Sequence, residues 1–212
     1  MVRTSNRRSK SQLRPLRRSG RRERRAVAVR SAILRAAAGV FRDRGFADTG
    51  MRDIAEAADI STANLYYYFG SKADILYFCQ QHSLDRMLEQ AAALERARLG
   101  PAERLRRMIA AHLLCTLDEL DGAAAHTEVD ALPPALRRRI VSRRDRYERA
   151  LRRMVAAGMR RRVFVRGDPA LLTRAILGAV NWTARWYRPG GRMAPQQVAQ
   201  AYADYLVRGL GA

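Results

Sequence analysis

The sequence predicts an all-α fold, and three observations support that prediction. Apolar residues recur at three- and four-residue spacing along most of the chain, as on the buried face of an amphipathic helix. Glycine and proline stand where this pattern breaks, for example at Gly100-Pro101 and at Gly167-Asp168-Pro169. The apolar run at 163–165 is too short for a convincing strand. A chain of 212 residues is long enough for one large or two small helical domains.

The N-terminus is strongly basic. Of the formal net charge of +21, +10 falls within residues 1–25, where eleven Arg and Lys residues accompany one acid, Glu23. Residues 1–22 show no apolar periodicity, so we expect a disordered basic arm there. The arm could reach into a minor groove, or it could be a solvated tail that adds only nonspecific attraction, which we favour. A charge balance of this kind indicates a polyanionic partner, most often nucleic acid.

A first helix is predicted over residues 23–44, and Gly45 ends it. Next, residues 49–72 read as two short helices joined by a tight turn. Thr49 or Gly50 can cap the first of the pair, with Asp53 in its first turn, where the helix dipole favours a negative charge. The apolar positions of these two helical segments share one face each: Ile33, Ala37, Val40 and Phe41, then Ile54, Ala55 and Ala58.

Ser61 or Thr62 can cap the second short helix, and Gly70 ends it. Leu65 and Phe69 lie four residues apart and should point inward together. The first turn carries small or polar side chains, and in a recognition helix that turn reaches base edges in the major groove. The side chains of this turn are Thr62, Ala63 and Asn64.

A further helix should begin at Lys72. Ser71 and Asp74 resemble a capping box with Asp in place of the usual Glu or Gln. A cation at the opening of a helix opposes the helix dipole, so an external anion such as a DNA phosphate would relieve the cost at Lys72.

The run LYYYF-G-SK after DIAEAADIS resembles the helix-turn-helix of the TetR family of bacterial regulators, over residues 29–78. The resemblance implies double-stranded operator DNA as a partner. Asn can pair bidentately with adenine and Arg with guanine. Tyr66 could instead be partly core, and Tyr68 departs from the His common at its position. The positions that match base-contacting residues of the family are Arg52, Thr62, Ala63 and Asn64, and those that match phosphate or groove-wall contacts are Tyr66, Tyr67, Tyr68 and Lys72.

The rest of the chain predicts a helical bundle. Proline, glycine and Asp-Pro signals set the ends of its helices. The stretch 121–132 should be irregular, with one short helix at most. The predicted helices are 72–99, 101–120, 134–158, 169–187 and 195–210.

The resemblance implies that this bundle binds a small molecule and forms a homodimer through its last two helices, where Trp182, Trp186, Tyr202 and Tyr205 supply apolar surface. The segments EVDALPP and ILGAVNWTARWYRPGG resemble a TetR subgroup that responds to acyl-CoA thioesters and controls fatty-acid or steroid catabolism. Each candidate pocket residue could instead be ordinary core. The candidates are Met108, His112, Cys115, Tyr147, Met154, Ile176 and Trp182.

These observations predict three parts: a basic arm (1–22), a helix-turn-helix DNA-binding domain (23–70) and a ligand-binding and dimerisation domain (71–212). The function they favour is a cytoplasmic repressor released from its operator by a small-molecule inducer, an acyl-CoA thioester if the subgroup resemblance holds. Activation and co-repression stay open. The alternatives are a TetR-type regulator of an efflux gene that responds to drug-like hydrophobic molecules, and a nonspecific basic nucleoid-type protein.

Other classes of function are not expected. The sequence shows no catalytic triad, phosphate loop or cofactor motif, so we expect neither an enzyme nor a cofactor. Cys79 and Cys115 match no zinc spacing, and the three histidines form no ligand pair. No apolar run approaches the roughly 20 residues that span a bilayer, so no membrane association is expected.

Overall fold

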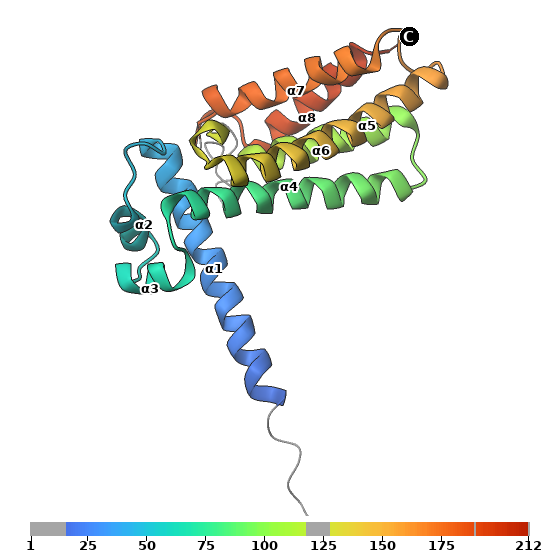
Figure 1. Cartoon of the computed structure of the whole chain (residues 1–212). Coiled ribbons are helices and arrows are strands. Elements are labelled where there is room, and N and C mark those ends of the chain that lie inside the picture. Colours follow the sequence, from blue (N-terminus) through green and yellow to red (C-terminus); the bar gives the residue numbers. More distant parts are fainter. Residues whose placement is uncertain (1–15, 118–127, 189, 212) are drawn as a thin grey trace, which may run out of the picture.

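The computed structural model describes residues 16–117, 128–188 and 190–211, and these form helices joined by short connections (Figure 1). The all-α prediction is confirmed. A head contains α1 (Leu16–Arg44), α2 (Met51–Ala57) and α3 (Thr62–Tyr68). A body contains α4 (Lys72–Arg96), α5 (Pro101–Leu117), the 3-10 turn η2 (Val129–Ala131), α6 (Pro134–Arg160), α7 (Pro169–Trp186) and α8 (Pro195–Arg208).

The start of α1 differs from the prediction. The helix begins at Leu16 rather than near residue 23, so residues 16–22 of the expected disordered arm are helical. Residues 16–22 carry no apolar stripe and include Gly20, a poor helix former, so the sequence pattern does not indicate this part of the helix. The first turns of α1 project beyond the rest of the head (Figure 1). The remaining arm (1–15) and most of the stretch expected to be irregular lie outside the described residues.

The short helices begin at the predicted cap residues. Ser61 Oγ accepts the backbone N–H of Asn64 at 3.1 Å, and Ser71 Oγ accepts that of Asp74 at 3.1 Å. At the start of α2, the Asp53 carboxylate accepts the backbone N–H of Gly50 at 2.7 Å. These bonds satisfy donors that a helix start leaves unpaired, and they fix where α3 and α4 begin.

Two apolar cores stabilise the molecule. The head core contains Phe41, Ile54, Leu65 and Phe69, and it continues along α4 to Leu84. It also includes residues from η2 and the start of α6, namely Val129, Leu132 and Ile140. The body core begins at Met87 and joins α4 to the inner faces of α5, α6, α7 and α8. The head therefore packs against residues of η2 and α6 as well as against α4.

The chain end closes the body. The backbone N–H of Val165 donates to the Leu210 carbonyl at 2.8 Å, and Phe164 forms an isolated bridge with Gly211. Phe164 is buried against Gly158 of α6. No helix within the described ranges is long and apolar enough to cross a membrane.

Candidate DNA-binding face and ligand cavity

The recognition helix α3 separates an inner from an outer face. Leu65 and Phe69 are buried in the head core, as predicted. Ala63 and Asn64 in the first turn are exposed. Arg30 of α1 lies over the Phe69 ring at 5.7 Å, a cation–π contact that fixes the end of α3 against α1. Ala63 and Asn64 thus lie on an outward-facing turn, and Thr62 beside them is half-buried.

The three tyrosines of α3 extend this outer face. Tyr66 is 53% exposed and Tyr67 is 82% exposed, so neither packs into the core. Tyr68 is half-buried, and its ring meets the Tyr67 ring edge-on at 5.2 Å. The alternative in which Tyr66 is partly core is therefore not what the structure shows.

The adjacent helix α2 presents Arg52, which is exposed. Arg44 at the end of α1 donates to Asp53 at 3.0 Å and so ties α1 to α2. The hydrogen bond from the Gly50 backbone, together with Arg44, lowers the pKa of the Asp53 carboxyl below its ordinary value.

Lys72 has an internal role that the sequence did not indicate. Its Nζ donates to the backbone carbonyls of Phe46 at 2.6 Å and Ala47 at 3.2 Å, and it lies 4.4 Å from the centre of the Phe46 ring. These carbonyls supply the negative partial charge that offsets an ammonium at a helix start. Two of its three N–H donors are engaged in these bonds.

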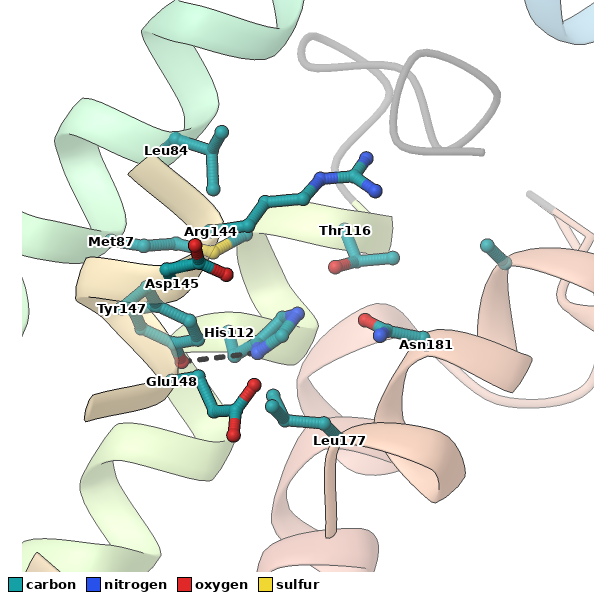
Figure 2. Close-up of a pocket in the computed structure, with 11 residues that line it drawn as sticks. Leu84, Met87, His112, Thr116, Arg144, Asp145, Tyr147, Glu148, Leu177 and Asn181 are labelled. Atoms are coloured by element: carbon teal, nitrogen blue, oxygen red, sulfur yellow. Dashed lines mark hydrogen bonds between the residues drawn. The ribbon is translucent and has the colours of Figure 1, made fainter. Parts of the chain in front are cut away.

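A cavity of about 260 Å³ lies in the body between α4, α5, α6 and α7 (Figure 2). Its walls combine four apolar residues with seven polar or charged ones. The lining residues are Leu84, Met87, His112, Thr116, Arg144, Asp145, Tyr147, Glu148, Leu177, Asn181 and Ala184.

His112 and Tyr147 form the polar centre of the cavity. The Tyr147 hydroxyl and His112 Nδ1 are 3.0 Å apart, within hydrogen-bonding distance (Figure 2). Burial lowers the pKa of His112 to about 4, although a hydrogen bond with Asn181 opposes that shift. Burial also raises the pKa of Tyr147 above its ordinary value. Both groups are therefore neutral near pH 7, and they connect α5, α6 and α7 by hydrogen bonds.

Three charged residues line the cavity: Arg144 and Glu148 are half-buried, and Asp145 is exposed. Glu148 pairs with Arg152, and Arg174 lies 3.8 Å from the same carboxylate oxygen. Burial lowers the pKa of the Arg144 guanidinium. Next to it in sequence, Arg143 donates to Asp85 at 3.0 Å and links α6 to α4.

Two of the seven predicted pocket residues line this cavity, His112 and Tyr147. Trp182 points away from it and is 65% exposed. The sequence analysis did not predict the lining residues of α4 and α7, among them Leu84, Met87 and Asn181. The other four candidates do not line the cavity and are buried in the body core: Met108, Cys115, Met154 and Ile176.

A separate apolar surface covers α7 and α8. Trp182 and Tyr205 are 65% and 74% exposed, and Leu171 is 64% exposed. Trp186 is also exposed, and its ring lies 6.1 Å from that of Tyr202, which packs against the body core. Soluble monomers rarely expose so many large apolar side chains on neighbouring helices.

Among the residues that the structure describes, no group of three or more His, Cys, Asp or Glu side chains could hold a metal ion. Cys79 and Cys115 are both buried, and neither forms a disulfide.

Comparison with known proteins accounts for both halves of the chain. Residues 33–77 match the family model of bacterial regulatory proteins of the tetR family, within the stretch where the sequence resembles that family. Residues 98–210 match the model of the tetracyclin repressor-like C-terminal domain. The HTH-type transcriptional repressor KstR2 of Mycobacterium tuberculosis is 27% identical over 191 residues, which cover 85% of this chain and 92% of KstR2.

Solved structures agree. The TetR family transcriptional regulator PfmR from Thermus thermophilus is 35% identical with a TM-score of 0.76, over 85% of this chain and 99% of PfmR. AibR in complex with isovaleryl coenzyme A and operator DNA is 26% identical with a TM-score of 0.74, over 86% of this chain and 98% of AibR. The chain therefore belongs to the TetR family and is a helix-turn-helix transcriptional repressor of that type.

Proposed function

We propose that a homodimer of this chain represses transcription by binding an operator through α3, and that an acyl-CoA thioester releases it. Residues 23–70 would bind DNA, and residues 71–212 would bind the ligand and form the dimer. Arg52, Thr62, Ala63 and Asn64 would meet base edges. Tyr66, Tyr67, Tyr68 and Lys72 would meet the backbone and groove wall. The exposure of Asn64, Tyr66 and Tyr67 supports these roles.

The dimer would form through α7 and α8. Two recognition helices enter successive major grooves only when they stand about 34–36 Å apart, which requires two copies of the head. The exposed side chains of Trp182, Tyr205 and Leu171 supply the apolar area that such an interface buries.

A structural relative favours a thioester over a drug-like molecule. The cavity of about 260 Å³ would hold a compact acyl group, with the rest of a thioester outside. AibR was solved with isovaleryl coenzyme A, and KstR2 is described as a ketosteroid transcriptional regulator. Control of an efflux gene by drug-like hydrophobic molecules is the second candidate.

The observation that carries this proposal is the position of Leu84. Its side chain lines the cavity and also belongs to the head core, which contains Leu65 of α3 and Phe69 just after it. A ligand that displaces Leu84 would disturb the core that also holds the inner face of α3. The free energy of operator binding would weaken at most by the difference between the ligand's binding free energies for the DNA-binding state and the released state.

A mobility-shift titration tests the proposal. The DNA upstream of the gene for this chain would be titrated with protein, alone and with a panel of acyl-CoA thioesters. Free coenzyme A and an unrelated DNA serve as controls. Specific binding that one thioester relieves supports the proposal. Specific binding that no thioester disturbs would redirect the search to drug-like ligands, and binding without sequence preference would favour the nucleoid-type alternative.

A further inference from the structure

Three buried polar side chains lie near the cavity without a hydrogen-bond partner. Gln80 and Ser83 are 0% exposed and Thr116 is 2% exposed. Among the residues that the structure describes, neither amide atom of Gln80, nor Ser83 Oγ, nor Thr116 Oγ1 finds a partner. Buried polar atoms in folded proteins are nearly always paired, so such a cluster calls for an explanation.

Of these side chains, Thr116 lines the cavity, whereas Gln80 and Ser83 do not line it but lie within about one turn of Leu84 on α4. Gln80, Leu84 and Met87 follow i, i+4, i+7 spacing and share one face of α4. On α5, the thiol of Cys115 lies 3.8 Å from the Ser83 carbonyl, which brings Thr116 close to this part of α4. Thr116 itself lines the cavity, and Figure 2 shows it between Arg144 and Asn181.

Elsewhere the fold pairs its buried threonines. Thr173 Oγ1 donates to the Pro169 carbonyl at 2.7 Å, and Thr183 Oγ1 donates to the Val180 carbonyl at 2.7 Å. Both residues are fully buried on α7, where a helical hydroxyl can reach a carbonyl one turn back. Thr116 is also helical but makes no such bond. Thr116 therefore differs from these paired threonines, and it lies at the cavity, at the border between the head core and the body core.

We propose that Gln80, Ser83 and Thr116 form the polar end of the ligand site and select an acyl group that carries an uncharged hydroxyl or keto group. This inference rests on the proposed thioester ligand. The three side chains offer both donors and acceptors without charge, which matches a hydroxyl or ketone. A carboxylate is a poor fit, because Asp145 and Glu148 line the same cavity as Arg144. A plain hydrocarbon chain would leave all the polar atoms unpaired.

The stability of the ligand-free protein gives the first test. Replacing a buried polar group that has no partner removes a desolvation cost and loses no bond. Thr116→Val and Gln80→Met should therefore raise the Tm, by about 2–4 °C for a chain of this size. The matched control Thr173→Val loses a hydrogen bond and should lower the Tm. A lower Tm in both Thr116→Val and Gln80→Met would show that these groups are paired in solution and would overturn the inference.

The second test compares acyl groups of equal length. Release of operator DNA would be titrated with butyryl-CoA, 3-hydroxybutyryl-CoA and acetoacetyl-CoA. We expect the two oxygenated thioesters to act at concentrations at least about tenfold lower than butyryl-CoA, because a site built around polar groups rejects an analogue that leaves them unpaired. In Thr116→Val and Gln80→Met the preference should disappear while operator binding remains.

Equal potency of the three thioesters, or a preference that survives in both variants, would overturn this inference and leave the thioester-responsive repressor intact. If none of the three thioesters releases specifically bound operator, the proposed selectivity for an oxygenated acyl group is wrong. The Tm test then decides separately whether the polar cluster is unpaired: a higher Tm in the variants supports an unpaired cluster, and a lower Tm contradicts it.

Discussion

Leu84 and Met87 stand three residues apart on α4 and line the same cavity, yet they belong to different apolar cores. Leu84 packs in the core that also holds the inner face of α3, and Met87 packs in the core of the body. A ligand between these walls would contact both cores at once. The boundary between the two cores thus falls on α4 at the residues where a ligand would bind. In the proposed release of DNA, α4 would therefore link the ligand cavity to the head.

Acid should destabilise the protein through His112. Its pKa in the folded chain is about 4, against an ordinary value of 6.5. Between those values the unfolded chain binds more protons, so stability rises with pH from about 4 to 6.5 and is lost on acidification, by roughly 3 kcal/mol at most. Urea unfolding of the wild type and of His112→Gln at pH 4.5 and 7 measures this contribution.

The carboxyl groups titrate in both proteins, so the comparison with His112→Gln isolates the histidine. The variant should lose less stability than the wild type between pH 7 and 4.5. Equal losses would mean that His112 is not held neutral by burial.

Gly158 should not tolerate a side chain. A Cβ at this position would lie 2.0 Å from Cδ2 of Phe164, whose ring is buried against α6. Gly158→Ala should destabilise the chain by about 1–3 kcal/mol, the usual cost of overpacking a core. Chemical unfolding measures the loss. As the control, Gly39→Ala in α1 meets nothing closer than 4.0 Å and should be neutral or stabilising, since alanine favours a helix.

Asn64→Ala should weaken operator binding by about 1–3 kcal/mol, the range for a bidentate contact with a base. The Asn64 side chain is exposed, so thermal unfolding should not change. Fluorescence anisotropy with operator and with scrambled DNA measures both affinities. Equal weakening on both DNAs would place Asn64 at the backbone rather than at a base.

Trp182→Asp should prevent dimerisation, because it places a charge within the apolar surface of α7 and α8. Size-exclusion chromatography with light scattering would then give the mass of one chain, and cooperative operator binding would be lost. Val27→Asp, also at a highly exposed apolar residue but on α1, should leave the mass unchanged. A Trp182→Asp protein that keeps the mass of two chains would move the interface away from this surface.

The short helices could be predicted from sequence because their signals are local. Ser61 and Ser71 cap α3 and α4 through residues three positions ahead, and the inward pair Leu65 and Phe69 follows directly from helical spacing. The early start of α1 at Leu16 escaped prediction because residues 16–22 carry no apolar stripe and include Gly20, a poor helix former.

The cavity depends on how four helices pack, and spacing within one helix predicts only part of it. On α7, the buried positions Thr173, Ile176 and Val180 form one stripe, and Trp182 falls on the opposite side of the helix. That stripe could have excluded Trp182 from the pocket. In contrast, nothing local indicated that Lys72 would bind the Phe46 carbonyl, because that bond joins residues 26 positions apart.

Reciprocal binding tests the central claim, that a thioester in the cavity and DNA at α3 act on one equilibrium. The affinity of the releasing thioester would be measured by calorimetry with and without saturating operator, and operator affinity with and without saturating thioester. Linkage requires the same factor in both directions, about 5- to 150-fold for typical coupling. Equal factors in that range would support the account. A thioester that binds equally well to free and operator-bound protein would contradict it.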